Sequence, residues 1–78
     1  VIKNSLFMNI QNDGIDISGS IITLENNEIY DCGDKAISIG ENSEVILNDN
    51  IIKNSELGVV CKDGSKCFLN STLRLTLN

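Results

Sequence analysis

The feature that most constrains the fold of this chain is a motif that recurs three times at intervals of 22 to 23 residues. Aligning the three copies places residues of one chemical type in shared columns. Three columns are aliphatic, one of them ending in a cysteine: Ile15, Ile37 and Val59; Ile17, Ile39 and Cys61; Leu24, Leu47 and Leu69. A fourth column contains Asn4, Asn27, Asn50 and Thr72. A period of this length is typical of repeat proteins, whose units stack because none can bury a core alone.

Within each repeat the apolar residues alternate with residues of another kind. The isoleucines of 15–17 and 37–39 are predicted to face inward, whereas Asp16, Ser38 and Val60 face outward. This period of two indicates strands, and Gly and Asn interrupt each run before a helix could form. Each strand is therefore expected to pair with its equivalent one coil away. The aliphatic columns would then fill the interior, and the Asn column would form an amide ladder at a corner.

These observations predict an all-β fold, a right-handed single-stranded parallel β-helix (solenoid) of about three coils of 22–23 residues. Residues 1–78 are expected to be a single β-helix segment, a fragment of a longer solenoid. The segments from Asn4 to Ile15 and from Asn27 to Ile37 differ by one residue, a variation that belongs in a corner loop. The alternating tail 73–77 predicts one further strand.

Composition and charge exclude several partners. The net charge is −5, the pI is about 4.3, and only six Lys and Arg residues are scattered along the chain, so we expect no nucleic-acid binding. No apolar run approaches the roughly 20 residues that span a bilayer, so we expect no membrane insertion. The absence of His and of a CxxC motif argues against zinc.

Four motifs carry a resemblance to a known family; they span residues 13–18, 26–29, 33–40 and 58–65. They resemble the right-handed β-helix repeats of pectate-lyase-like proteins. They are most similar to the repeat region of large secreted bacterial proteins that also carry CotH-type kinase-like or lamin-tail domains. The resemblance covers Asn4 to about Thr72. It implies the fold and an extracellular or cell-surface location, with an export signal outside this segment. It does not select a function, because the family includes lyases, epimerases, adhesins and non-catalytic scaffolds.

Two outward columns contain acidic residues: Asn12, Asp34 and Glu56, and Gly19, Glu41 and Asp63. Each brings two carboxylates within about one strand spacing, which could hold calcium through oxygen ligands. The preferred alternative is that they are solvated corner residues. Arg74, the only arginine, falls outside the repeats, so no lyase site is visible. The sequence therefore assigns no catalytic, cofactor-binding or metal-binding residue, and calcium is the one cofactor left to test.

The three cysteines allow different states. Cys61 and Cys67 replace aliphatic residues in inward columns, which predicts buried thiols. The alternative is a Cys61–Cys67 disulfide that closes the turn between them, which export would permit. Cys32 is expected in the variable corner, as a free thiol or an internal filler. Residues 70–72 match a glycosylation sequon. Their places in the repeat, a turn followed by the Asn column, explain these residues better than glycosylation does.

The leading functional hypothesis is a structural or scaffold module of an extracellular protein, with weak binding of a polysaccharide. The alternative is a set of non-catalytic coils from a polysaccharide lyase or epimerase, whose active groove lies on other coils. A third expectation concerns assembly, because the outermost coils of a short β-helix expose unpaired strand edges. The segment is therefore expected to associate end to end.

Overall fold

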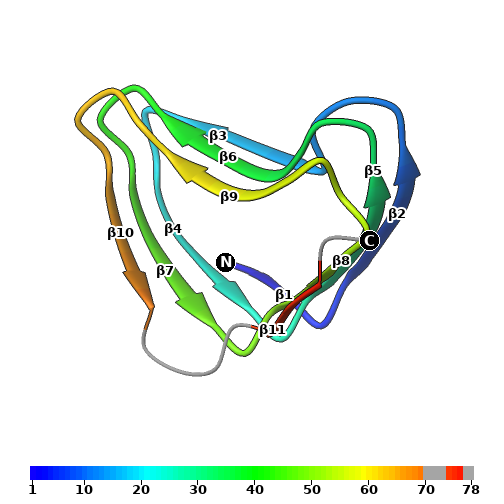
Figure 1. Cartoon of the computed structure of the whole chain (residues 1–78). Helices are drawn as coiled ribbons and strands as arrows, with labels where there is room; N and C mark the ends of the chain where they lie inside the picture. The colour runs from blue at the N-terminus through cyan, green and yellow to red at the C-terminus, as the bar shows by residue number, and fades with distance from the viewer. Residues whose placement is uncertain (70–73, 77–78) are drawn as a thin grey trace.

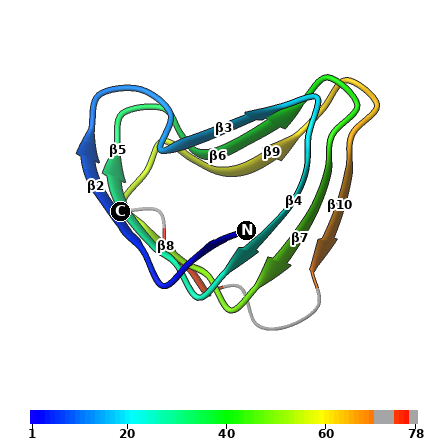
Figure 2. The ribbon, with the colours of Figure 1, turned by 180° about the vertical axis from the view of Figure 1, so that it is seen from behind.

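The computed structural model describes residues 1–69 and 74–76, and this part of the chain forms strands, turns and no helix. Three parallel sheets wind around one interior (Figures 1 and 2). One sheet has the order β1 (Ile2–Lys3), β4 (Ile21–Glu25), β7 (Glu44–Asn48), β10 (Lys66–Leu69). Another has the order β2 (Leu6–Ile10), β5 (Glu28–Cys32), β8 (Ile51–Lys53), β11 (Arg74–Thr76). The third consists of β3 (Ile15–Ser18), β6 (Lys35–Gly40) and β9 (Leu57–Cys61).

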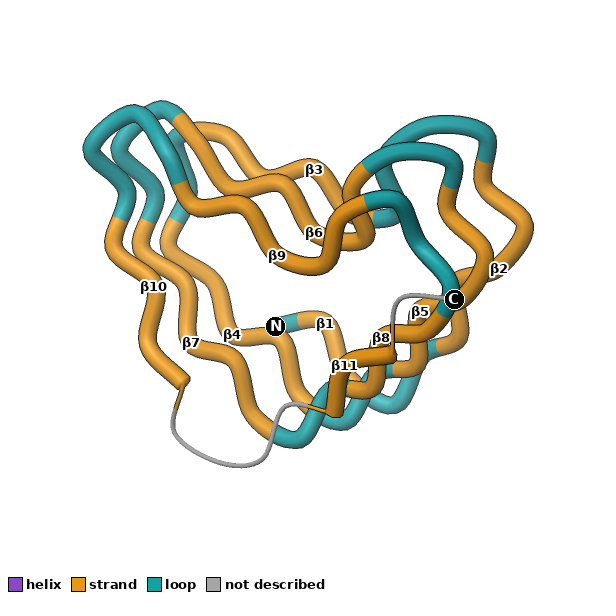
Figure 3. The backbone as a smooth tube through the Cα atoms, viewed as in Figure 1, coloured by secondary structure: helices purple, strands orange, loops and turns teal. Residues whose placement is uncertain are grey.

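Each coil of the chain contributes one strand to each sheet and turns at three corners (Figure 3). The loops lie at the corners, and the strands of successive coils stack in parallel. This arrangement confirms the predicted all-β solenoid of about three coils. The tail also forms a strand, since β11 pairs with β8; residues 73 and 77 lie outside the described part.

The predicted aliphatic columns are confirmed as rows of paired residues on neighbouring strands. The pairs are Ile15–Ile37 and Ile37–Val59, Ile17–Ile39 and Ile39–Cys61, and Leu24–Leu47 and Leu47–Leu69. Ile37, Ile39 and Leu24 are completely buried, and each such side chain contributes about 1.5–3 kcal/mol relative to exposure. At the last coil the rows end, so Leu69 is 60% exposed.

The prediction of an asparagine column is confirmed in part. Asn27 and Asn50 form a buried ladder, in which the Asn27 Nδ2 donates to the Asn50 Oδ1 at 3.1 Å. The position of Asn4 in this column was wrong by one residue: Leu6 pairs with Glu28, so Ser5 precedes Asn27 in the row. The Ser5 N–H donates to the Asn27 Oδ1 at 3.1 Å, and Asn4 instead accepts from Asn26. Thr72 lies outside the described residues.

The observed strand pairing also places the one-residue differences between coils at other positions than predicted. They still fall in corners. Strands β2 and β5 pair with an offset of 22 residues, so their coils are equally long up to β3 and β6. One change falls between β3 and β4, where the first coil is one residue shorter than the next. Another falls between β8 and β9, where the third coil is one residue shorter than the second.

Asn and Asp are frequent because the bends need a left-handed backbone conformation. Asn9, Asp31 and Asn54 occupy equivalent positions, with φ of 57°, 57° and 55°. Asn and Asp tolerate this region better than other side chains. The Asn54 Nδ2 also donates to the Asp31 Oδ1 at 2.7 Å, which ties two coils together. Near the same corner a Cβ at Gly33 would collide with the Gln11 carbonyl oxygen, so only glycine fits there.

Candidate functional site

The outer face of the β3-β6-β9 sheet carries a polar depression of about 250 Å³. Its lining comes from all three strands and the corners that flank them: Asp13, Asp16, Ile17, Ser18, Lys35, Ser38, Gly40, Glu41, Lys62 and Asp63. Asp16, Ser18, Ser38 and Gly40 reach this face because they alternate with the inward isoleucines, as the strand period requires. We refer to this set of residues as the polar depression.

Ser38 forms the centre of the floor. It lies between Asp16 and Val60 in one row across the sheet, as the sequence predicted. It differs from the prediction in being only 4% exposed, because the side chains around it cover an outward position. Among the described residues the Ser38 hydroxyl has no hydrogen-bond partner. Since buried hydroxyls are normally hydrogen-bonded, this group is available to a molecule in the depression.

Gly40 extends the floor beside Ser38. A Cβ at this position would lie 3.3 Å from the Asp63 Oδ2 and 3.7 Å from the Lys62 Cε. These two charged side chains therefore fold closely over Gly40. A larger residue would displace them and alter the shape of the depression.

One end of the depression holds a lysine between carboxylates. The Lys35 Nζ lies 3.1 Å from the Asp34 Oδ2 and 3.9 Å from the Asp13 Oδ1. The hydrogen bond to Asp34 and the charges of Asp13, Asp34 and Asp16 raise the pKa of Lys35, with burial opposing them. Lys35 is therefore an ammonium group at neutral pH, and it neutralises part of the acidic charge at this end.

The other end is formed by the corner that follows β6. The Ser18 hydroxyl donates to the Glu41 Oε2 at 2.7 Å, and this bond fixes the carboxylate above the first strand of the sheet. Glu41 and Asp63 both have positive φ, 53° and 55°, so they belong to the bend rather than to the strands. The bend aims both acidic side chains along the same face.

The predicted acidic columns are confirmed as neighbours in space. The Asp34 N–H donates to the Asn12 carbonyl and the Leu57 N–H to the Asp34 carbonyl, both at 3.2 Å, which places Glu56 next to Asp34. The Asn42 N–H donates to the Asp63 carbonyl at 2.9 Å, which places Glu41 beside Asp63. Within the described residues no three carboxylates or thiols converge as metal ligands. Calcium binding stays a prediction that no observation of this structure supports.

The repeat pattern did not identify Lys35, Ser38 and Lys62 as site residues. The outward alternation of Ser38 and the offset of 22 residues between Gly40 and Lys62 place them on this face. Neither pattern shows that Ser38 is a buried residue, or that its hydroxyl has no hydrogen-bond partner among the described residues. Arg74 lies on β11, in the sheet of β2 rather than beside the depression.

The prediction that Cys61 and Cys67 are buried thiols was wrong. Cys61 and Cys67 form a disulfide that closes the turn after β9, and Cys61 is exposed rather than buried. Among the described residues no further strand pairs with β9 or β10, and the two sulfurs bond across the turn between these strands. Cys32 is a free thiol with 4% exposure, and it fills the interior at the end of β5.

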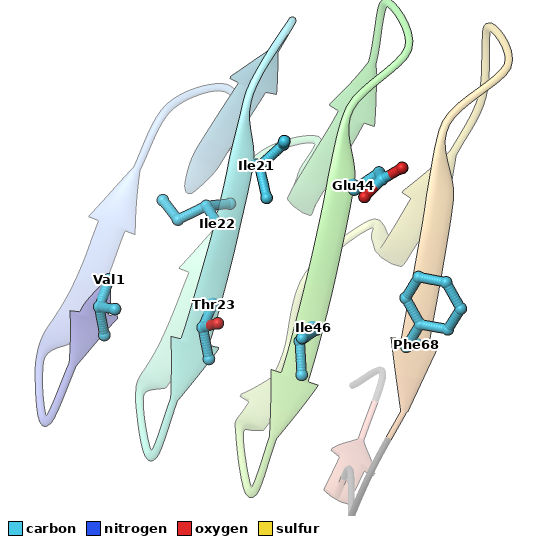
Figure 4. A pocket seen from close by; sticks show the side chains of 7 residues that line it. All are labelled: Val1, Ile21, Ile22, Thr23, Glu44, Ile46 and Phe68. Carbon is cyan, nitrogen blue, oxygen red and sulfur yellow. The ribbon is translucent and has the colours of Figure 1, made fainter.

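A second, apolar depression of about 180 Å³ lies on the outer face of the β1-β4-β7-β10 sheet (Figure 4). Thr23, Ile46 and Phe68 form one row across its strands, and Val1 stands beyond Thr23. Ile21 is 85% exposed and Phe68 48% exposed. Glu44 is the one charged side chain among its described lining residues, which are otherwise apolar apart from Thr23.

Three parallel sheets wound coil upon coil define this protein as a β-solenoid. Residues 1–74 match the family model described as "right handed beta helix region", so the chain belongs to the right-handed β-helix family. No curated protein and no solved structure gives a significant match to the chain. Residues 1–69 and 74–76 include no helix that is long and apolar enough to cross a membrane.

Proposed function

We propose that this chain is a structural β-helix module of an extracellular or cell-surface protein, with weak carbohydrate binding in the polar depression. The observation that carries the proposal is the continuity of the interior rows from coil to coil. Buried corner side chains bond to the adjoining coil, as Asn50 does through its Nδ2 to the Leu24 carbonyl at 2.9 Å. Such a rod holds its outward side chains at a fixed spacing of about 4.8 Å, which suits a spacer that displays a surface.

The Cys61–Cys67 disulfide supports the extracellular location. Disulfides persist in oxidising compartments and are rare where thiols are kept reduced. The resemblance to secreted CotH- and lamin-tail-associated repeats supports it as well. Intact-mass measurement of the exported protein, with and without thiol alkylation, tests this part. In denaturant, which exposes the buried Cys32, we expect one alkylated cysteine without prior reduction, and three would contradict the proposal.

The chemistry of the polar depression supports the carbohydrate part. Carboxylates, ammonium groups and a hydroxyl can exchange hydrogen bonds with sugar hydroxyls. Within the described lining there is no aromatic side chain to stack on a sugar ring, and the depression is shallow. The affinity is therefore expected to be low, with a dissociation constant on the order of 1 mM.

Amide NMR shifts of the full chain test this binding. Tetrasaccharides of neutral, acidic and amino sugars are titrated separately to about ten times the expected dissociation constant. We expect shifts centred on Asp16, Ser38 and Gly40. Shifts centred on the apolar depression instead, or none with any sugar, would contradict the proposed site.

One observation favours a second candidate, the coils of a polysaccharide lyase or epimerase. Lys35 and Lys62 share an outward face with Asp13 and Asp16, and lyase chemistry needs a base near acidic residues. However, a general base needs a pKa near the working pH, and the pKa of Lys35 is raised. Incubation with uronate polymers, followed by ultraviolet absorbance of unsaturated products, is expected to give no turnover. Turnover that Asp16→Asn abolishes would replace the structural proposal by the enzymatic one.

We also propose that the chain associates end to end. The outermost strands of the third sheet, β3 and β9, each have one edge without a strand neighbour among the described residues. Unpaired strand edges are templates for pairing with another chain. Sedimentation equilibrium of the 78-residue chain is expected to give a mass that rises with concentration. A monomer at every concentration would contradict this proposal.

A further inference from the structure

The charge of the polar depression is unbalanced. Its lining has four carboxylates, from Asp13, Asp16, Glu41 and Asp63, and two ammonium groups, from Lys35 and Lys62. An excess of negative charge disfavours acidic ligands and attracts cations, because like charges that approach without a counter-ion repel. The Asp16 carboxylate makes no hydrogen bond or ion pair within the described residues. It is thus available to a ligand.

A second and independent observation comes from the floor. Ser38 as a residue is only 4% exposed, and its hydroxyl has no hydrogen-bond partner among the described residues. It lies in the row next to Asp16, about 4.8 Å away along the sheet. A hydroxyl can both donate and accept, so the floor pairs a neutral hydrogen-bonding group with a free carboxylate. This pair fits a ligand that carries a cation beside a hydroxyl.

An organic cation suits the depression better than a metal ion does. Among the residues that the structure describes, no three acidic or thiol groups converge as ligands. A carboxylate beside a single hydroxyl supplies too few oxygens for calcium, which takes six to eight. An organic ammonium needs far fewer, because its three N–H groups can be shared between a carboxylate and neighbouring oxygens.

We propose that the polar depression selects sugars that carry a primary ammonium group, such as glucosamine oligomers, over neutral and uronic acid sugars. The ammonium group binds the Asp16 carboxylate, and an adjacent sugar hydroxyl bonds the Ser38 hydroxyl. This inference rests on the carbohydrate binding proposed above, and it adds the class of sugar. It assigns Asp16 the electrostatic part of recognition and Ser38 the hydrogen-bonding part.

Isothermal titration of the full chain with four tetrasaccharides tests this selectivity. These are β-1,4-linked tetramers of glucosamine, N-acetylglucosamine and glucose, together with tetragalacturonate. We expect glucosamine to bind most tightly and to weaken as salt rises, since screening reduces charge pairing. Equal binding of the acetylated or glucose tetramer, or tighter binding of galacturonate, would overturn the ammonium selectivity and leave the carbohydrate proposal standing. Failure of all four sugars to bind would overturn both.

Two variants locate the site. Asp16→Asn removes the free charge at almost constant shape, and it is expected to weaken glucosamine binding about two- to five-fold. Glu25→Gln is the matched control, because it removes one exposed carboxylate from the β4 strand of another sheet. Ser38→Ala is expected to weaken glucosamine and glucose tetramers by a similar factor. An effect of Glu25→Gln equal to that of Asp16→Asn would mean that net charge alone drives binding, which would overturn the site.

A control titration with a cationic peptide distinguishes recognition of a sugar from attraction of any cation. Trilysine carries ammonium groups without sugar hydroxyls, so it is expected to bind more weakly than the glucosamine tetramer and to be insensitive to Ser38→Ala. Trilysine binding that equals glucosamine binding would overturn the assignment to an amino sugar. Thermal unfolding of each variant, unchanged from the parent chain, confirms that the losses arise from the site.

Discussion

The Asn27 side chain offers a sharp test of how the coils are held together. It is completely buried and makes three hydrogen bonds. Its Oδ1 accepts from the Ser5 N–H at 3.1 Å, and its Nδ2 donates to the Ile2 carbonyl at 3.0 Å and to the Asn50 Oδ1 at 3.1 Å. These bonds join three successive coils. Replacement of Asn27 therefore removes a connection that runs along the axis of the solenoid.

The expected cost of Asn27→Ala follows from the groups left behind. The Ser5 N–H and the Ile2 carbonyl lose their partners, whereas the Asn50 Oδ1 keeps its bond from the Asn27 backbone N–H at 3.1 Å. Each buried group without a partner costs about 1–3 kcal/mol. Both groups are only partly buried, so water offsets some of this cost. We expect the free energy of unfolding to fall by about 2–4 kcal/mol.

Urea denaturation followed by far-ultraviolet circular dichroism measures this change, because the slope of the transition reports whether cooperativity is kept. Asn12→Ala is the matched control: Asn12 is exposed, and its side chain has no partner among the described residues. Its effect should stay within about 0.5 kcal/mol. A loss below about 1 kcal/mol for Asn27→Ala, or equal losses for both variants, would refute the role of the ladder.

Asn27→Asp refines the same test. The carboxylate has nearly the shape of the amide and can still accept from the Ser5 N–H. It cannot donate, so an oxygen would face the Ile2 carbonyl and the Asn50 Oδ1. Protonation of the carboxyl would restore one donor. Asn27→Asp should therefore destabilise the fold more at pH 7 than at pH 4, measured relative to the parent chain, and the opposite order would contradict the bonding described here.

Three other perturbations probe separate features. Gly33→Ala places a Cβ against a backbone carbonyl and should cost about 1–3 kcal/mol, whereas Gly40→Ala, which meets flexible side chains, should cost less in the same urea measurement. Reduction of the Cys61–Cys67 disulfide, with a sequence separation of 6, should lower stability by about 2 kcal/mol in the loop-entropy model, and an unchanged Tm would show that the closed turn does not constrain the unfolded chain. The raised pKa of Lys35 stabilises the fold below the ordinary lysine value of 10.5, and this contribution is lost as pH rises through the folded-state value. The Tm should therefore fall more steeply between about pH 10 and 12 in the parent chain than in Lys35→Gln, and parallel curves would contradict this assignment.

The architecture could be predicted from the amino-acid repeat, because like residues stack on like in a solenoid. The 22-residue offset of Ile15, Ile37 and Val59 gave the correct strand pairing, since a shift of one residue would turn the isoleucines toward water. The asparagine ladder was predicted correctly at Asn27 and Asn50 but not at Asn4. The pairing of Leu6 with Glu28 places Ser5 in this row, where its N–H donates to the Asn27 Oδ1.

The state of the cysteines and the location of the candidate site depend on contacts between coils, which the repeat pattern does not specify. Cys61 occupies an inward column, but it is bonded to Cys67 across the turn after β9 instead of packing in a core. Ser38 occupies an outward column, yet its neighbours cover it and leave its hydroxyl without a partner among the described residues. Strand period specifies the face on which a side chain lies. Its exposure and partners depend on side chains about 22 residues away in sequence, which only the stacked coils bring together.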